Sequence, residues 1–194
     1  MKEKELSELF DKIFRSSLVI LDNLKKGFFG QNVSLIQDSE NKFHDILISS
    51  LPAVEKIISE KEKDAAETKY VILLPKLQTI ALAIENLMFK MEAKVSSRIL
   101  FSQKALSEIE ALYDAMMDQF RNTKDYMKTK NPALKTATRK NMEAIFKMVE
   151  EFSVVHQNRL ITGICMPQAS YLYIDITDSL KRISRGLMDF TEKV

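Results

Sequence analysis

Residues 70–95 read YVILLPKLQTIALAIENLMFKMEAKV, the most regular apolar pattern in the chain. Apolar side chains recur there at alternating steps of three and four residues, which gathers them on one stripe of an α-helix. This pattern predicts a helix over residues 64–95 with one buried face. The stripe consists of Tyr70, Leu73, Leu74, Leu77, Ile80, Ala81, Ile84, Leu87, Met88, Met91 and Val95.

The same spacing recurs on both sides of this segment and predicts six amphipathic helices in all. Only four Gly and four Pro occur among 194 residues, with no Trp. Sheets joined by tight turns need more turn residues, so an all-β fold is excluded and we expect an all-α protein. The predicted helices cover residues 4–28, 33–61, 64–95, 103–129, 132–161 and 168–193.

Glycine and proline predict local features of these helices. Gly27 and Gly30 are expected to close the first helix, where a left-handed residue is needed. Pro52 and Pro75 fall inside the second and third helices. Since proline removes a backbone donor and clashes with the preceding turn, we expect kinks or breaks at both positions.

Long helices with short connections must fold back on one another, so three consecutive helices are expected to form an antiparallel bundle. We therefore predict two tandem three-helix domains, residues 1–97 and 98–194. A shift of about 100 residues overlays the two halves, which favours internal duplication over shared helical spacing alone. The overlay places Ile80, Ile84, Leu87, Met88 and Glu92 on Leu180, Ser184, Leu187, Met188 and Glu192.

Charge and composition narrow the class of protein. The 29 basic and 27 acidic residues leave a net charge of +2, too balanced to predict nucleic-acid or anionic-membrane binding. No run approaches the roughly 18 apolar residues of a transmembrane helix, and the acidic start does not resemble a signal peptide. A single cysteine, Cys165, excludes an internal disulfide and suits a reducing compartment. We expect a cytoplasmic protein.

Residues 156–169, HQNRLITGICMPQA, are the most specific motif in the chain. They resemble the H-x-x-R-L-x-x-G-x-C-x-P-x-A segment of PhoU-like proteins, including the C-terminal PhoU-like region of bacterial sodium/phosphate cotransporters. Residues 101–109 resemble the start of that family's second repeat. The motif positions, expected to be structural, are His156, Arg159, Gly163, Cys165 and Pro167.

The resemblance implies a pair of three-helix bundles without catalysis or cofactors. It implies control of phosphate uptake through contacts with a phosphate transporter or its sensor kinase, and family members often form homodimers. Several members bind metal clusters through acidic motifs on the third and sixth helices. Here the matching positions are Ala81 and Glu85 on the third helix and Lys181 and Arg185 on the sixth. Because cations repel a metal ion, we predict that this degenerate site holds no metal.

Lys181, Arg182 and Arg185 are instead a candidate face for an anion, such as a phosphate or an acidic partner surface. Residues 181 and 185 lie one helical turn apart and share a face. The alternative is a solubilising face paired with Asp178 and Asp189.

Further candidates have a structural alternative. His156 is expected to be a core-edge imidazole hydrogen-bonded near a helix end, and alternatively a metal ligand or pH-sensing contact. His44 and Glu40 form an exposed pair or a metal clip. Cys165 is structural or a reactive thiol.

The sequence lacks E-x-x-H pairs, phosphate-binding glycine loops and G-x-S-x-G, so no catalytic residue is predicted. We expect a non-enzymatic PhoU-like regulator. The alternatives are a metal-binding helical bundle and a helical adaptor unrelated to phosphate.

Overall fold

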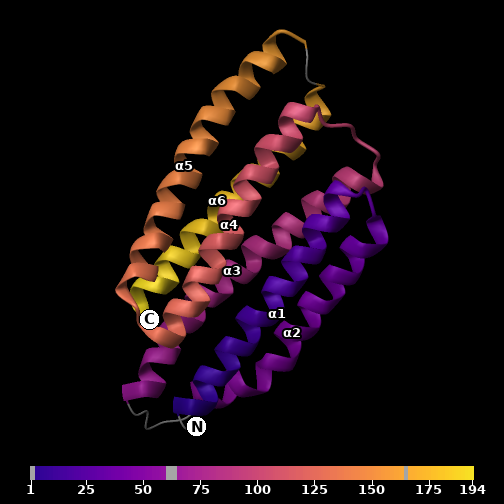
Figure 1. The fold of residues 1–194 in the computed structure, drawn as a ribbon. Coiled ribbons are helices and arrows are strands. Elements are labelled where there is room, and N and C mark those ends of the chain that lie inside the picture. Colours follow the sequence, from indigo (N-terminus) through magenta and orange to yellow (C-terminus); the bar gives the residue numbers. More distant parts are fainter. Residues whose placement is uncertain (1–2, 60–64, 164–165) are drawn as a thin grey trace.

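The computed structural model describes residues 3–59, 65–163 and 166–194, and this part of the chain forms six α-helices without strands (Figure 1). The all-α prediction is confirmed, and the helix bounds agree with the predicted ranges to within a few residues. The helices are α1 (Glu3–Phe29), α2 (Val33–Ser59), α3 (Ala65–Ser96), α4 (Gln103–Thr129), α5 (Pro132–Ile161) and α6 (Pro167–Lys193).

The end of α1 differs from the prediction. Gln31 takes the left-handed conformation, with φ of 53°, so the prediction that Gly27 or Gly30 supplies it was wrong. Gly27 lies inside α1, where an added Cβ would come within 2.8 Å of Ile36 Cγ1. This glycine therefore lets α1 and α2 approach closely.

The two internal prolines do not break their helices. Pro52 lies within α2 and Pro75 within α3. Leu73 and Ile80, on either side of Pro75, are almost completely buried. Tertiary packing therefore holds the helix together where one backbone hydrogen bond is lost.

Each half of the chain packs as a trio of helices. Helices α1, α2 and α3 contact one another, as do α4, α5 and α6. The halves meet where α1 packs on α4 and α3 packs on α6, while α2 and α5 lie on opposite outer sides (Figure 1). Corresponding helices of the two halves thus make corresponding contacts, while internal duplication stays a prediction.

One hydrophobic core runs through both halves. The ring of Phe14 in α1 lies 5.1 Å from the rings of Phe120 in α4 and Phe190 in α6, measured between centroids. The two-bundle description therefore applies to the helix order, while the core is shared. The domain boundary at residue 97 stays a prediction.

Helices α3 and α6 run antiparallel, and two contacts fix their register. Gly186 lies against Ile80, and Lys90 Nζ is 2.7 Å from Asp175 Oδ2. An added Cβ at Gly186 would come within 2.8 Å of Ile80 Cγ1, so glycine allows this close crossing. The register places residues 81 and 85 at the same height as residues 185 and 181.

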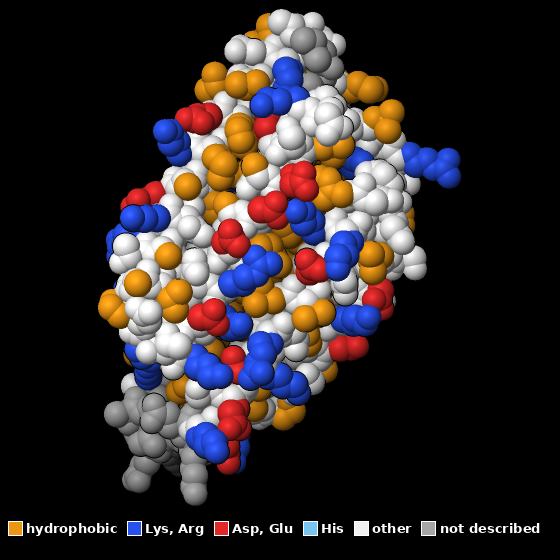
Figure 2. Space-filling view, viewed as in Figure 1, with side chains coloured by type: hydrophobic (Ala, Val, Ile, Leu, Met, Phe, Trp, Pro, Cys, Tyr) orange, Lys and Arg blue, Asp and Glu red, His pale blue; other side chains and the backbone are white. Residues whose placement is uncertain are grey.

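Two features of the structure concern whether the chain could associate with a membrane: the distribution of surface charge and the apolar composition of α3. Basic and acidic side chains are interspersed on the face seen in Figure 2. Residues Thr68–Ser96 of α3 are long and apolar enough to cross a membrane by length and composition, and an 18-residue window within them has a mean hydropathy of 1.4. In this structure α3 packs against α1, α2 and α6. The absence of a transmembrane segment stays a prediction.

Candidate functional site: a cationic hollow between α3, α5 and α6

The predicted basic face lines a hollow of about 480 Å³ between three helices. Lys181, Arg182 and Arg185 reach it from α6 together with the carboxylate of Asp178, and Phe146 reaches it from α5. The α3 side is mixed, with Thr79, Leu82, Ala83 and Asn86. The structure therefore brings the three predicted basic residues together with an aromatic ring that the sequence pattern did not identify.

Phe146 positions two of the cations. Lys181 Nζ and the guanidinium carbon of Arg185 each lie 4.9 Å from the centre of its ring. Cations are attracted to the electron-rich face of an aromatic ring, and this attraction strengthens where water is partly excluded. The half-buried ring thus restricts two long side chains that would otherwise be free to move.

The charges of this face are only partly balanced. Arg182 Nε donates a hydrogen bond to Asp178 Oδ2 across 2.8 Å. Within the described residues, Lys181 and Arg185 form no ion pair with a carboxylate, and Asp189 forms none with either. The expected pairing with Asp178 therefore involves Arg182, and two positive charges remain for an outside group.

This arrangement suits an anion attached to an apolar group. A lysine ammonium offers three donors, and the arginine guanidinium offers a planar fork that matches a carboxylate or phosphate. Leu82 and Phe146 supply apolar contact beside these donors. The hollow therefore fits a ligand that has both features.

Residues 81, 85, 181 and 185, the positions that match the metal motifs of PhoU-like proteins, lie at the same level along the bundle axis but do not form one site. Ala81 is buried beside Phe43 of α2, whereas Lys181 and Arg185 lie over Phe146 of α5. Glu85 is half-buried on α3. Over residues 3–59, 65–163 and 166–194, no three His, Cys, Asp or Glu side chains gather as metal ligands do. The expected lack of metal stays a prediction.

The family-like motif builds a buried ion pair elsewhere in the second half. Arg159 of α5 donates to the Glu108 carboxylate of α4 from both terminal guanidinium nitrogens, from Nη2 to Oε2 across 2.7 Å and from Nη1 to Oε1 across 3.3 Å. Tyr173 of α6 donates its hydroxyl to the same carboxylate across 2.7 Å. This cluster connects all three helices of the second half.

His156 completes the cluster. Its ring stacks on Tyr173 with a centroid distance of 4.3 Å, and its Nδ1 lies 3.5 Å from Arg159 Nη2. Burial lowers the pKa of His156, and the charge of Arg159 lowers this pKa further, although Glu108 opposes the effect. Burial also raises the pKa of Tyr173, as does its hydrogen bond to Glu108.

The remaining motif positions lie at the turn between α5 and α6. Gly163 has φ of 71°, a left-handed conformation that glycine adopts without strain, and its N–H bonds to Leu160 O. Pro167 occupies the first turn of α6. Cys165 lies outside the described residues, so its two interpretations stay open.

Sequence reasoning missed Glu108 as a site residue. It belongs to the buried face of α4, beside Ala105 and Leu112. A lone acid on an apolar stripe is a signal for a buried partner, but its partner is 51 residues away along the chain. His44, by contrast, is exposed on α2.

Comparisons with known proteins add no relative: no protein-family model, curated protein or solved structure matches this chain. The resemblance to PhoU-like proteins rests on the sequence motifs alone.

Proposed function

We propose that this chain is a non-enzymatic, cytoplasmic PhoU-like regulator that binds an acidic segment of a phosphate transporter or sensor kinase. The binding surface is the hollow between α3, α5 and α6. The observation that carries the proposal is the pair Lys181 and Arg185, held over Phe146 and without a carboxylate partner among the described residues. The link to phosphate comes from the motif at residues 156–169.

The α3 wall supports a protein segment as the occupant. Ile72, Leu82 and Phe89 are large apolar side chains that are half or more exposed. Their spacing places them, with Thr79 and Asn86, on one stripe along α3. An amphipathic helix can lay an apolar face on such a stripe. Acidic residues at its edge would then reach Lys181 and Arg185.

Charge argues against a second copy of this chain as the occupant. A two-fold symmetric dimer uses the same patch on both subunits, so Lys181 and Arg185 of each subunit would approach those of the other. Like charges at an interface are unfavourable. The homodimer that the resemblance implies would therefore use another face.

Affinity capture from phosphate-replete cells, followed by mass spectrometry, tests this proposal. The wild-type chain should recover a component of a phosphate transporter or sensor kinase. The variant Lys181→Glu/Arg185→Glu should lose it, because reversed charges repel an acidic segment. The matched control Lys128→Glu/Lys140→Glu makes the same charge change at exposed positions on α4 and α5 and should capture as wild type does.

Two results would overturn the proposal. One is that the wild-type chain captures no such component. The other is that Lys181→Glu/Arg185→Glu captures the transporter or kinase component as well as the control variant does, while both variants show the circular dichroism of the wild type. Titration with inorganic phosphate alone distinguishes the two anions that could bind the hollow, an acidic protein segment and free phosphate. Binding of phosphate that Lys181→Glu/Arg185→Glu abolishes, without a captured protein, would replace the docking surface with an anion site.

A further inference from the structure

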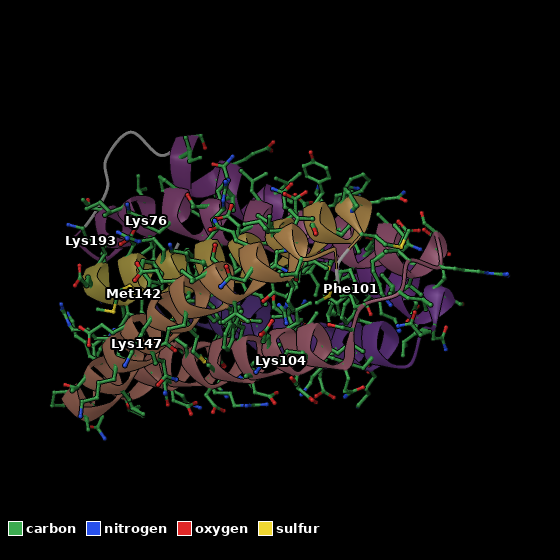
Figure 3. All side chains as sticks on the ribbon, turned by 90° about the horizontal axis from the view of Figure 1, so that it is seen from above. Lys76, Phe101, Lys104, Met142, Lys147 and Lys193 are labelled. Atoms are coloured by element: carbon green, nitrogen blue, oxygen red, sulfur yellow. The ribbon has the colours of Figure 1, made fainter. Side chains whose placement is uncertain are left out.

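A second cavity, of about 280 Å³, lies where α4 begins and α6 begins. Its lining includes Phe101 and Ser102 just before α4, His156 of α5, and Met166 and Tyr173 at α6. Figure 3 shows Phe101 at the opposite end of the bundle from Lys193. No residue of this lining belongs to the cationic hollow.

The contacts of His156 determine which ring nitrogen carries its proton. Arg159 Nη2 lies 3.5 Å from Nδ1. A guanidinium group only donates hydrogen bonds, so Nδ1 must accept. Burial disfavours the charged imidazolium, and the ring is therefore neutral with its proton on Nε2. His156 presents Nε2–H as a hydrogen-bond donor.

This donor lacks a partner among the residues that the structure describes. His156 is 2% exposed, and its Nε2 has no hydrogen-bond acceptor among the described residues. Buried polar atoms are nearly always paired, because desolvation without a hydrogen bond is unfavourable. The neighbouring Glu108 carboxylate is already bonded by Arg159 and Tyr173. The unpaired Nε2–H is thus a hydrogen-bond donor that a ligand in the cavity can reach.

The other walls define what fits. The rings of Phe101 and Tyr173 stand edge to face at 6.4 Å between centroids, and Leu100, Ala105 and Ala169 add aliphatic contact to the lining. Ser102 Oγ accepts a hydrogen bond from the Ala105 N–H, which leaves the hydroxyl hydrogen available to a ligand. Met166 is exposed and provides an adaptable apolar side at the opening.

We propose that this cavity binds a small neutral molecule with a single aromatic or apolar ring and a carbonyl acceptor that bonds to His156 Nε2–H. A neutral ligand fits better than a carboxylate, because the Glu108 carboxylate is bonded to the Tyr173 hydroxyl of the lining and Arg159 is already engaged with that carboxylate. The volume is at the lower limit of small-molecule sites, which suits one ring. The site is independent of the proposed docking surface.

Imidazole NMR on the full chain tests the proposal, because the sequence holds two histidines, His44 and His156. The unliganded protein should show the His156 proton on Nε2. Acetophenone should shift this signal saturably. Ethylbenzene, which lacks the acceptor, should bind about tenfold more weakly, the effect of one hydrogen bond. Benzoate, which is charged, should also bind more weakly.

Substitutions show whether acetophenone binds in the cavity beside His156. His156→Phe keeps a ring on Tyr173 but removes the donor, so acetophenone should lose its advantage over ethylbenzene. His44→Phe and Lys181→Glu/Arg185→Glu should bind acetophenone as the wild type does, which separates this site from the docking surface.

Four results would overturn the proposal: a proton on Nδ1, no saturable shift, equal affinity for ethylbenzene, or unchanged acetophenone binding by His156→Phe. If only water occupies the cavity, no saturable shift will appear. The ligand comparison in the wild type decides the question even where His156→Phe does not fold.

Discussion

Replacing Arg159 with methionine should destabilise the protein strongly, because it leaves the Glu108 carboxylate buried without its cation. The Glu108 side chain is 1% exposed and that of Arg159 is 10% exposed. Removing one partner of a buried ion pair costs about 3–5 kcal/mol. Tyr173 still donates to the carboxylate, and Lys104 Nζ lies 3.8 Å from Glu108 Oε1, so we expect about 3 kcal/mol, at the lower end of this range.

A double-mutant cycle separates the ion pair from the packing. Glu108→Leu and Arg159→Met are each expected to destabilise, since each leaves one buried charge. The double variant removes both charges and should recover much of the loss, with a coupling free energy of about 2–3 kcal/mol. Urea unfolding followed by circular dichroism measures all four proteins. In thermal unfolding, the single variant Arg159→Met should melt about 6–12 °C lower than wild type.

Additive effects would refute this reasoning. If the double variant loses the sum of the two single losses, the pair contributes through packing alone. A loss below about 1 kcal/mol for Arg159→Met would show that the carboxylate is solvated and the pair is not buried.

Two further predictions concern stability. The pKa of His156 is lowered on folding, so its contribution to the free energy of unfolding is fully present above the unfolded pKa of about 6.5 and is lost as pH falls below it. Thermal unfolding at pH 7.5 and 5.5 should therefore show a smaller acid-induced loss of stability in His156→Phe than in His44→Phe. Equal losses in the two variants would contradict the lowered pKa of His156. Gly186→Ala should destabilise the protein by about 1–2 kcal/mol despite alanine's better helix propensity, because the added Cβ would lie 2.8 Å from Ile80 Cγ1. Urea unfolding measures this change. A variant more stable than the wild type would show that α3 and α6 can move apart without loss of stability.

Apolar spacing was sufficient to predict the helices, since burial of one face determines where each helix forms. The residues that the stripe over 70–95 predicts as buried include Leu73, Ile84 and Leu87, and all three are almost fully buried. The end of α1 was less predictable. Gln31, a residue with no special preference for positive φ, supplies the left-handed turn because the backbone N–H of Asn32 bonds back to Gly27 O.

Contacts between helices required the structure. Residues 181 and 185 share a face by spacing alone, but the position of Phe146 beneath them depends on how α5 is aligned with α6. The same holds for Glu108, whose role emerges only where α4 meets Arg159 and Tyr173. A single sequence records which residues are on a helix face but not which faces meet.

Photo-crosslinking in phosphate-replete cells shows directly whether the hollow docks an acidic segment of a partner protein. A photoreactive amino acid replaces Leu82, which is 53% exposed at the hollow, or Val19, which is 63% exposed on α1. We expect an adduct with a phosphate transporter or sensor-kinase component from position 82, none from position 19, and loss of the adduct with Lys181→Glu/Arg185→Glu. No adduct from position 82, or an adduct only with a second copy of this chain, would contradict it.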